Sequence, residues 1–384
     1  MPDRRPTLQE QIDDLMRRFD AVNDLYIRKI AAQILTIGEL NATSMDRIRI
    51  MAQMNADIME INARLAAAAQ MAVPDLMKIY ESALTDLYYD ERFERALKDT
   101  PLSREAKHRL ERLAQTVGRQ SAQTMQNLSN TTIASQQYRR IVDRAVLAVT
   151  TGLGDYKSAV RDGIREVGYN GLQMQYPSGY RRRLDTAIRQ NIIDGAKQIA
   201  QQGSDMMSEE LGYDAVEISV HLMPAPDHAP VQGHIFLREE FEKLQSEQPF
   251  EDINGNRFEP IRRQIGQWNC MHIAMGFSTM YGRPKYSQEQ LDGILARNSE
   301  GCMIGGRRYT MYEASQLMRR IETQVRREMD TAVAAAKVDD MELRQQCQKR
   351  INALNARYKQ VTDASGLRPH RDRMRVEGFR RVKV

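Results

Sequence analysis

The sequence predicts a mainly α-helical protein with a small α+β module: a helical N-terminal region, a small antiparallel sheet in the centre and a long C-terminal helix. Of the 22 glycines, only Gly38 and Gly118 precede Thr151. Because glycine costs a helix interior about 1 kcal/mol relative to alanine, this near absence indicates helices. β-Branched alternation in Val216–Val220 predicts the sheet, and an apolar stripe after Thr310 predicts the long helix.

Four helices are predicted in the N-terminal third, at residues 7–37, 43–70, 74–97 and 100–128. Thr7 with Glu10 forms a capping box at the first, and Thr43 is the expected N-cap of the second. Pro74 and Pro101 indicate the next two starts, because proline in a first turn loses no helical hydrogen bond.

The middle of the chain is expected to carry three more helices and the sheet. The helices are predicted at residues 138–149, 156–167 and 181–202. Val216–Val220 and Gly233–Leu237 are expected to pair as a hairpin, and Phe250–Pro260 to form a further β-turn around Asn254 and Gly255.

Two capping boxes begin the C-terminal helices. Ser287 begins a short helix to about Arg297, and Thr310 begins the longest predicted helix, which ends at Gly366. The apolar stripe of that helix repeats every 3.67 residues or so, as in a roughly straight helix. A stripe of this kind needs a partner, either the N-terminal helices of the same chain or another protein.

The chain therefore divides into three predicted regions: a helical N-terminal adapter region (1–137), an α+β core with the histidine and cysteine motifs (138–286), and a C-terminal long helix with a basic tail (287–384). Its 41% hydrophobic and 28% charged residues indicate a folded protein. No apolar run approaches the roughly 20 residues of a membrane span. Three cysteines fit a reduced compartment, so synthesis in a cytoplasm is expected.

Positive charge is concentrated at the C-terminus. The tail from residue 368 to 384 has seven basic residues and two acidic ones, an excess of +5 that equals the net charge of the whole chain. DNA contact is therefore expected from the tail, although basic tails can also serve only solubility. The basic residues are Arg368, Arg371, Arg373, Arg375, Arg380, Arg381 and Lys383.

Histidines and cysteines gather in the central region and are candidate metal ligands. They are His221, His228, His234, Cys270 and His272. Imidazole and thiolate together suit zinc, but the spacing matches no standard finger, so histidines that only hydrogen-bond loop backbone are the alternative. A Cys270–histidine nucleophile pair is the catalytic version of this cluster. Because no glycine-framed nucleophile turn accompanies it, the sequence predicts no enzyme.

Several motifs occur in a fixed order between about Tyr138 and Arg375. They are Tyr176–Gly179, Arg183–Arg189, Val216–His221, Pro226–Gly233, Trp268–His272, Tyr309–Gln316 and Gly366–Pro369. In this order the motifs resemble those of the phage minor capsid protein 2 family, a relative of phage head morphogenesis proteins. The chain departs from the family pattern at Met271, where arginine is usual, and at His234, where lysine is usual. The ligand set then narrows to His221, His228, Cys270 and His272.

The resemblance implies a structural protein of the bacteriophage head, made in the bacterial host cytoplasm and located in the virion. Its implied partners are the portal and major capsid proteins, during head assembly or DNA packaging, with packaged DNA reached through the tail. No cofactor is implied, and zinc is the one metal that the ligand set suggests. The alternative is a metal- or cysteine-dependent hydrolase carried in the head, for which Cys270→Ala would leave a folded but inactive protein.

Overall fold

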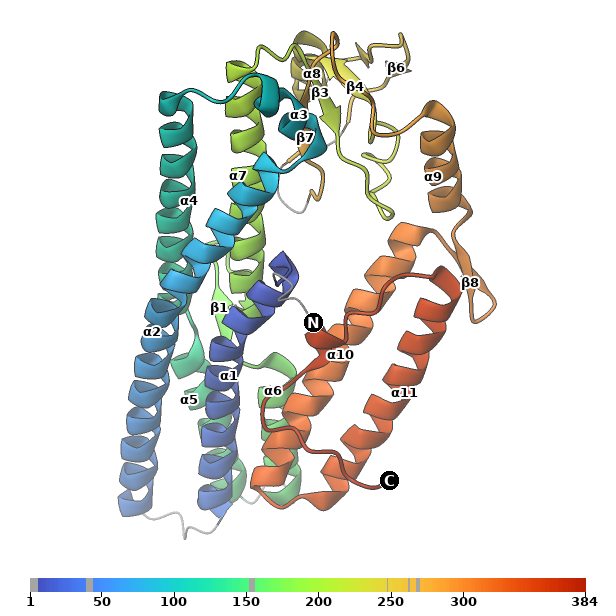
Figure 1. Ribbon diagram of the computed structural model, residues 1–384. Coiled ribbons are helices and arrows are strands. Elements are labelled where there is room, and N and C mark those ends of the chain that lie inside the picture. The colour runs from blue at the N-terminus through green and yellow to red at the C-terminus, as the bar shows by residue number, and fades with distance from the viewer. Residues whose placement is uncertain (1–5, 39–43, 152–155, 247, 262, 267–269) are drawn as a thin grey trace, which may run out of the picture.

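The computed structural model describes residues 6–38, 44–151, 156–246, 248–261, 263–266 and 270–384. These residues form a body of long helices, a small β module at one end of it and a helical hairpin along one side (Figure 1). The predicted fold class is confirmed, since the chain is mainly α-helical with a small central antiparallel sheet. None of the helices in the described ranges combines the length and the apolarity that a membrane span requires.

The helices of the body come first along the chain. They are α1 (Leu8–Gly38), α2 (Ser44–Tyr88), α3 (Glu91–Asp99), α4 (Arg104–Asn130), α5 (Ala134–Thr151), α6 (Tyr156–Asn170) and α7 (Leu184–Glu210). The helices of the β module and of the hairpin follow: α8 (Arg238–Gln245), α9 (Gln288–Glu300), α10 (Met311–Lys337), α11 (Met341–Ser365) and the 3₁₀ turn η1 (Arg371–Met374).

The first predicted helix is confirmed, and its capping box forms as expected. The backbone N–H of Thr7 donates to Glu10 Oε2 at 2.7 Å, and the Glu10 N–H donates to Thr7 Oγ1 at 3.3 Å. Thr43, the expected cap of the next helix, lies outside the described residues. The start predicted at Pro101 is displaced, because the side chain of Ser103 is the cap that accepts from Ala106 N–H (3.1 Å).

The predicted helix start at Pro74 is wrong, because α2 runs through this proline without ending. Proline lacks the N–H that would bond to the carbonyl four residues earlier. The neighbouring turn is tied to α1 by Arg18, whose guanidinium donates to the Met71 carbonyl (3.1 Å) and to the Asp75 carboxylate (2.6 Å). Packing on α1 thus holds together a helix that the local sequence would allow to break.

The single long C-terminal helix is also wrong, since α10 and α11 form an antiparallel hairpin (Figure 1). The turn is made by Asp339, which has a positive φ of 52°, and by Asp340, whose side chain accepts from Leu343 N–H and caps α11. Arg161 of α6 donates a hydrogen bond through Nε to Asp340 Oδ2 at 2.6 Å. The two halves of the predicted stripe therefore bury one another, in a cluster that includes Val325 and Val361.

Three short strands form the main sheet, in the order β4-β3-β7, and every pairing is antiparallel. The hairpin of β3 with β4 is confirmed, whereas β7 was not predicted. The strands are β1 (Gln173–Gln175), β2 (Arg181–Arg183), β3 (Ala215–Ile218), β4 (Ile235–Leu237), β5 (Phe250–Glu251), β6 (Arg257–Phe258), β7 (Ala274–Phe277), β8 (Cys302–Ile304) and β9 (Arg307–Tyr309). A helix was predicted to begin at residue 181, but residues 181–183 form strand β2, and α7 begins at Leu184.

One hydrophobic core joins the N-terminal helices to α5, α6 and α7 and to the lower part of the hairpin. A smaller separate core fills the β module, around Phe236 and Phe250. The predicted division at residues 137/138 and 286/287 stays a prediction.

A buried ion network lies where α7 and the hairpin meet. Arg183 donates through Nη2 to Asp330 Oδ2 at 2.8 Å, and Arg326 donates through Nη1 to Asp185 Oδ2 at 2.7 Å. Burial alone would raise the pKa of Asp185, but the charges of Arg326 and Arg183 outweigh it and hold that pKa below its ordinary value. Asn23 of α1 completes the network, with its amide nitrogen 3.4 Å from Asp330 Oδ1.

Asp20 of α1 lies near this network and gives the first testable prediction. Burial, and then the negative charge of Asp185, raises its pKa from 3.8 to about 7. Between the ordinary carboxyl pKa of 3.8 and about 7, the unfolded chain is ionised at Asp20 while the folded protein keeps the proton, so stability falls as the pH rises through this range and the full cost is present above pH 7. This pKa shift corresponds to a destabilisation of at most about 4 kcal/mol. Because the side chain retains some solvent exposure, we expect about 2 kcal/mol.

Asp20→Asn should leave the free energy of unfolding unchanged near pH 4, stabilise the protein increasingly as the pH rises to 7, and then level off. Urea unfolding at pH 4, 6 and 8 measures this. Asp14→Asn, a change at an exposed carboxylate on the same helix, is the control and should have little effect at any pH. An equal effect of Asp20→Asn at pH 4 and pH 8 would contradict the assignment.

Gly168 of α6 gives a second prediction, because α6 crosses α10 closely at this residue. A Cβ at Gly168 would lie 2.5 Å from Thr331 Cα and 2.6 Å from Thr331 N, which is backbone that no side-chain rotation can clear. We expect Gly168→Ala to lower the free energy of unfolding by about 2 kcal/mol or more. Gly293→Ala in α9, where the added methyl meets open space, should instead raise it by about 0.5–1 kcal/mol. Urea unfolding of both variants at pH 7 tests the contrast.

Candidate functional site

The sheet register brings the histidine and cysteine motifs to one end of the β module. Strand β3 is central, so the connection from β3 to β4 and the segment that leads into β7 meet beside its end. Ile218 pairs with Ala274 there. His228 lies on the β3–β4 connection, and Cys270 and His272 lie just before β7. Residues far apart in the sequence therefore become neighbours.

Three of the four predicted ligands form a compact cluster. Cys270 Sγ lies 3.3 Å from His228 Nδ1 and 3.6 Å from His272 Nδ1. One ligand atom from each of the three residues can be chosen so that all lie within 4.8 Å of one another. The three residues are 1–2% exposed, so this cluster is enclosed by protein.

The two other histidines of the sequence prediction lie differently. His221 stands edge-on to the His272 ring, with centroids 4.7 Å apart, and its Nε2 faces the Met271 carbonyl. His234 pairs with the Asp252 carboxylate at 2.7 Å. The structure thus brings His228, Cys270 and His272 together and gives His221 and His234 other partners. Trp268 and Asn269 of the same motif lie outside the described residues.

Oxygen acceptors orient both imidazoles of the cluster. His228 Nε2 is 2.7 Å from the Arg263 carbonyl, so this nitrogen carries the proton and donates it. His272 Nε2 faces Gln232 Oε1 at 3.4 Å, and the same oxygen accepts from the His221 backbone N–H at 2.9 Å. With each Nε2 protonated in the neutral ring, each Nδ1 presents a lone pair toward the sulfur.

Burial and mutual contacts shift the pKa values of all three groups in the cluster. Burial raises the pKa of the Cys270 thiol, but the contact with His228 and the backbone hydrogen bonds at Gly266 and His272 together outweigh burial and lower that pKa. The pKa of His228 is raised in turn, because Cys270 and the Arg263 carbonyl outweigh its burial. Burial and the neighbouring charges of His221 and His228 lower the pKa of His272 to about 3, so His272 is neutral.

Helix α7 hydrogen-bonds to the chain segment that carries Cys270 and to strand β7, a role that the sequence analysis missed. Lys197 Nζ donates to the Cys270 carbonyl at 2.7 Å. The Gln201 side chain both donates to the Ala274 carbonyl (2.9 Å) and accepts from the Ala274 N–H (2.8 Å), as a neighbouring strand would. Ser204 Oγ accepts from the Gly276 N–H at 2.8 Å. Polar residues at spacings of three and four on α7 were the available signal.

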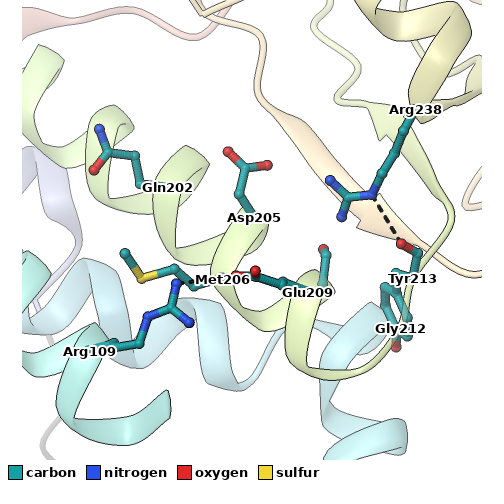
Figure 2. Close-up of a pocket in the computed structure, with 9 residues that line it drawn as sticks. Arg109, Gln202, Asp205, Met206, Glu209, Gly212, Tyr213 and Arg238 are labelled. Carbon is teal, nitrogen blue, oxygen red and sulfur yellow. Dashed lines mark hydrogen bonds and ion pairs between the residues drawn. The ribbon is translucent and has the colours of Figure 1, made fainter. Parts of the chain in front are cut away.

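Two clefts border α7 where it meets the β module. One, of about 630 Å³, is lined by residues that include Tyr176, Lys197 and His272, so the cluster adjoins it through His272. The other, of about 610 Å³, is lined mainly by charged and polar residues, together with Met206 and Gly212. Figure 2 shows that the Arg238 guanidinium and the Asp205 carboxylate face this second cleft, with Arg238 bound to the Tyr213 carbonyl at 3.0 Å.

The basic C-terminal segment lies against the hairpin (Figure 1). Met374 is buried and Phe379 packs against the hairpin core. Arg373 is turned inward, 3.7 Å from Glu322. The other six predicted DNA-contact residues are exposed: Arg368, Arg371, Arg375, Arg380, Arg381 and Lys383.

Over residues 5–363 the chain matches the family model described as phage minor capsid protein 2. The chain therefore belongs to the phage minor capsid protein 2 family, as its motifs predicted, and is a structural protein of the bacteriophage capsid. Neither a curated protein nor a solved structure matches it.

Proposed function

We propose that this minor capsid protein associates with the portal and the capsid shell and acts in head assembly or DNA packaging. The observation that carries the proposal is an exposed apolar stripe along the first half of α2. It consists of Met45, Ile48, Met51 and Met59, which are 58–73% exposed. Exposed apolar surface of this kind is typical of protein interaction sites.

The α2 stripe is distinct from the face that α2 needs for its own fold. The buried face contains Met54, Ile61 and Leu65, which are each at most 3% exposed and belong to the main core. At 100° per residue, the four stripe residues cover about a third of the helix circumference, and this third does not overlap the buried face. Methionine side chains are flexible and polarisable, which suits a surface that adapts to another protein. Family membership supports a capsid protein as the partner.

A structural role is favoured over the hydrolase alternative by the burial of the central cluster. A cysteine nucleophile must reach the carbon that it attacks. Cys270 is only 2% exposed, and its sulfur is occupied by two imidazoles. Its lowered pKa therefore supports a stabilising contact better than an accessible nucleophile.

Charge placed on the α2 stripe tests the proposal. The triple variant Met45→Glu, Met51→Glu, Met59→Glu should keep the helical circular dichroism spectrum. It should bind the phage's own portal protein at least about tenfold more weakly, because burying each methionine side chain at the contact contributes roughly 1–2 kcal/mol. Co-sedimentation with co-expressed portal and mass spectrometry of assembled heads measure binding and incorporation.

The matched control is the double variant Met280→Glu, Met303→Glu. These methionines are 75% and 59% exposed, but they lie on the β module and on β8. The control should bind and be incorporated like the unchanged protein. If the triple variant were incorporated as well as the control, the α2 stripe would not be the portal contact.

We further propose that the C-terminal segment contacts packaged DNA. Its exposed arginines are held on a fixed path, because Leu367 and Met374 are anchored in the hairpin core. Deleting the segment would expose that core, so the charges should be removed instead. We therefore compare Arg371, Arg375, Arg380 and Arg381→Gln with a matched set on α4, Arg104, Lys107, Arg112 and Arg119→Gln.

The tail variant should lose most salt-sensitive retention on DNA. The magnitude of the slope of log K against log salt should fall by up to about 3.6, because each of the four phosphate contacts contributes roughly 0.9. The α4 variant should keep its salt-sensitive retention on DNA and the slope of the unchanged protein. Fluorescence anisotropy with duplex DNA at several salt concentrations measures the slopes. Equal slopes for the two variants would show that the tail has no special role in binding DNA.

A further inference from the structure

The enclosed cluster has the chemistry of a metal site. Its three ligand atoms are one thiolate sulfur and two imidazole nitrogens, the donor set that zinc prefers among the common protein metals. The three residues come from two chain segments more than 40 residues apart, which the sheet brings together.

The distances fit a tetrahedral ion. With Zn–S of about 2.3 Å and Zn–N of about 2.0–2.1 Å, the sulfur and nitrogen atoms on one edge of the tetrahedron are about 3.5–3.6 Å apart. The separations from Cys270 Sγ are 3.3 Å to His228 Nδ1 and 3.6 Å to His272 Nδ1. Both sulfur–nitrogen separations therefore lie close to the spacing that a tetrahedral ion would impose, and one ligand atom from each of the three residues lies within 4.8 Å of the others.

The surrounding groups prepare the histidines as ligands. A metal-binding histidine typically donates its second N–H to a carbonyl or carboxylate, which fixes the ring and leaves the other nitrogen free to bind. The Arg263 carbonyl does this for His228, and Gln232 Oε1 faces the second nitrogen of His272. Because the His221 backbone N–H also binds Gln232 Oε1, that amide is itself held in place.

We propose that His228 Nδ1, Cys270 Sγ and His272 Nδ1 bind one Zn²⁺. The ion would link the β3–β4 connection to the segment before β7. The β module has a small core and short strands, and small domains of this kind commonly gain stability from a structural metal. The site would thus stabilise the module, and this inference does not depend on the portal proposal.

Metal content of the full-length protein tests the proposal. After expression with added zinc and removal of free metal, mass spectrometry should find about one zinc per chain. Cys270→Ser and His272→Gln should each lose at least about nine-tenths of it. Two matched controls should retain it: Cys302→Ser, a change at a cysteine on β8, and His234→Gln, a change at a histidine of the same module that pairs with Asp252.

A measurement on the unchanged protein keeps the test valid if a ligand variant fails to fold. Cobalt that replaces zinc should give a thiolate-to-cobalt charge-transfer band and the intense visible bands of a tetrahedral site, and added zinc should remove both. His221→Gln should retain zinc, because His221 Nε2 faces the Met271 carbonyl. The proposal is overturned by zinc-free protein without a cobalt–thiolate band, by a folded Cys270→Ser that keeps its zinc, or by loss of zinc in His221→Gln.

Discussion

The buried network of Arg183, Asp185, Arg326 and Asp330 is the constraint on which the rest of the structure depends. It joins the start of α7 to α10, and Asn23 adds α1. Removing one partner from a buried ion pair leaves an uncompensated charge, so the network permits one arrangement of these helices and penalises others. The backbone is adapted to it as well, since a Cβ on Gly171 would lie 2.8 Å from Arg183 Cζ.

Helix α7 connects this network to the histidine and cysteine cluster. Its 27 residues span about 40 Å, with Asp185 of the network in its first turn and the contacts to β7 further along the chain. Strand β7 lies at the edge of the sheet, where backbone groups are commonly left unpaired. The Gln201 side chain pairs with the N–H and the carbonyl of Ala274 on this edge. The position of β7, and with it the position of Cys270, is therefore set by a helix anchored at its far end in the ion network.

Local signals in the sequence predicted the fold well where the structure is locally determined. The capping boxes at Ser287 and Thr310 both form, because each depends only on residues three apart. Pro74 and the hairpin turn at Asp339 were mispredicted, because tertiary contacts from Arg18 and Arg161 decide them. For the cluster, residue type selected four candidate ligands, and three of them, His228, Cys270 and His272, lie together in the structure. It could not place His221, whose partner is a backbone carbonyl brought near by the sheet.

The hairpin changes which surface of the protein needs a partner. A single long helix would have exposed its whole apolar stripe, but in the hairpin residues such as Val325 and Val361 cover one another. The basic segment then closes the hairpin core with Met374. The α2 stripe is among the apolar residues that stay exposed, and it belongs to a helix held by the main core. A rigid helix loses little entropy on association, so this surface is better suited than a flexible tail to a permanent contact within a capsid.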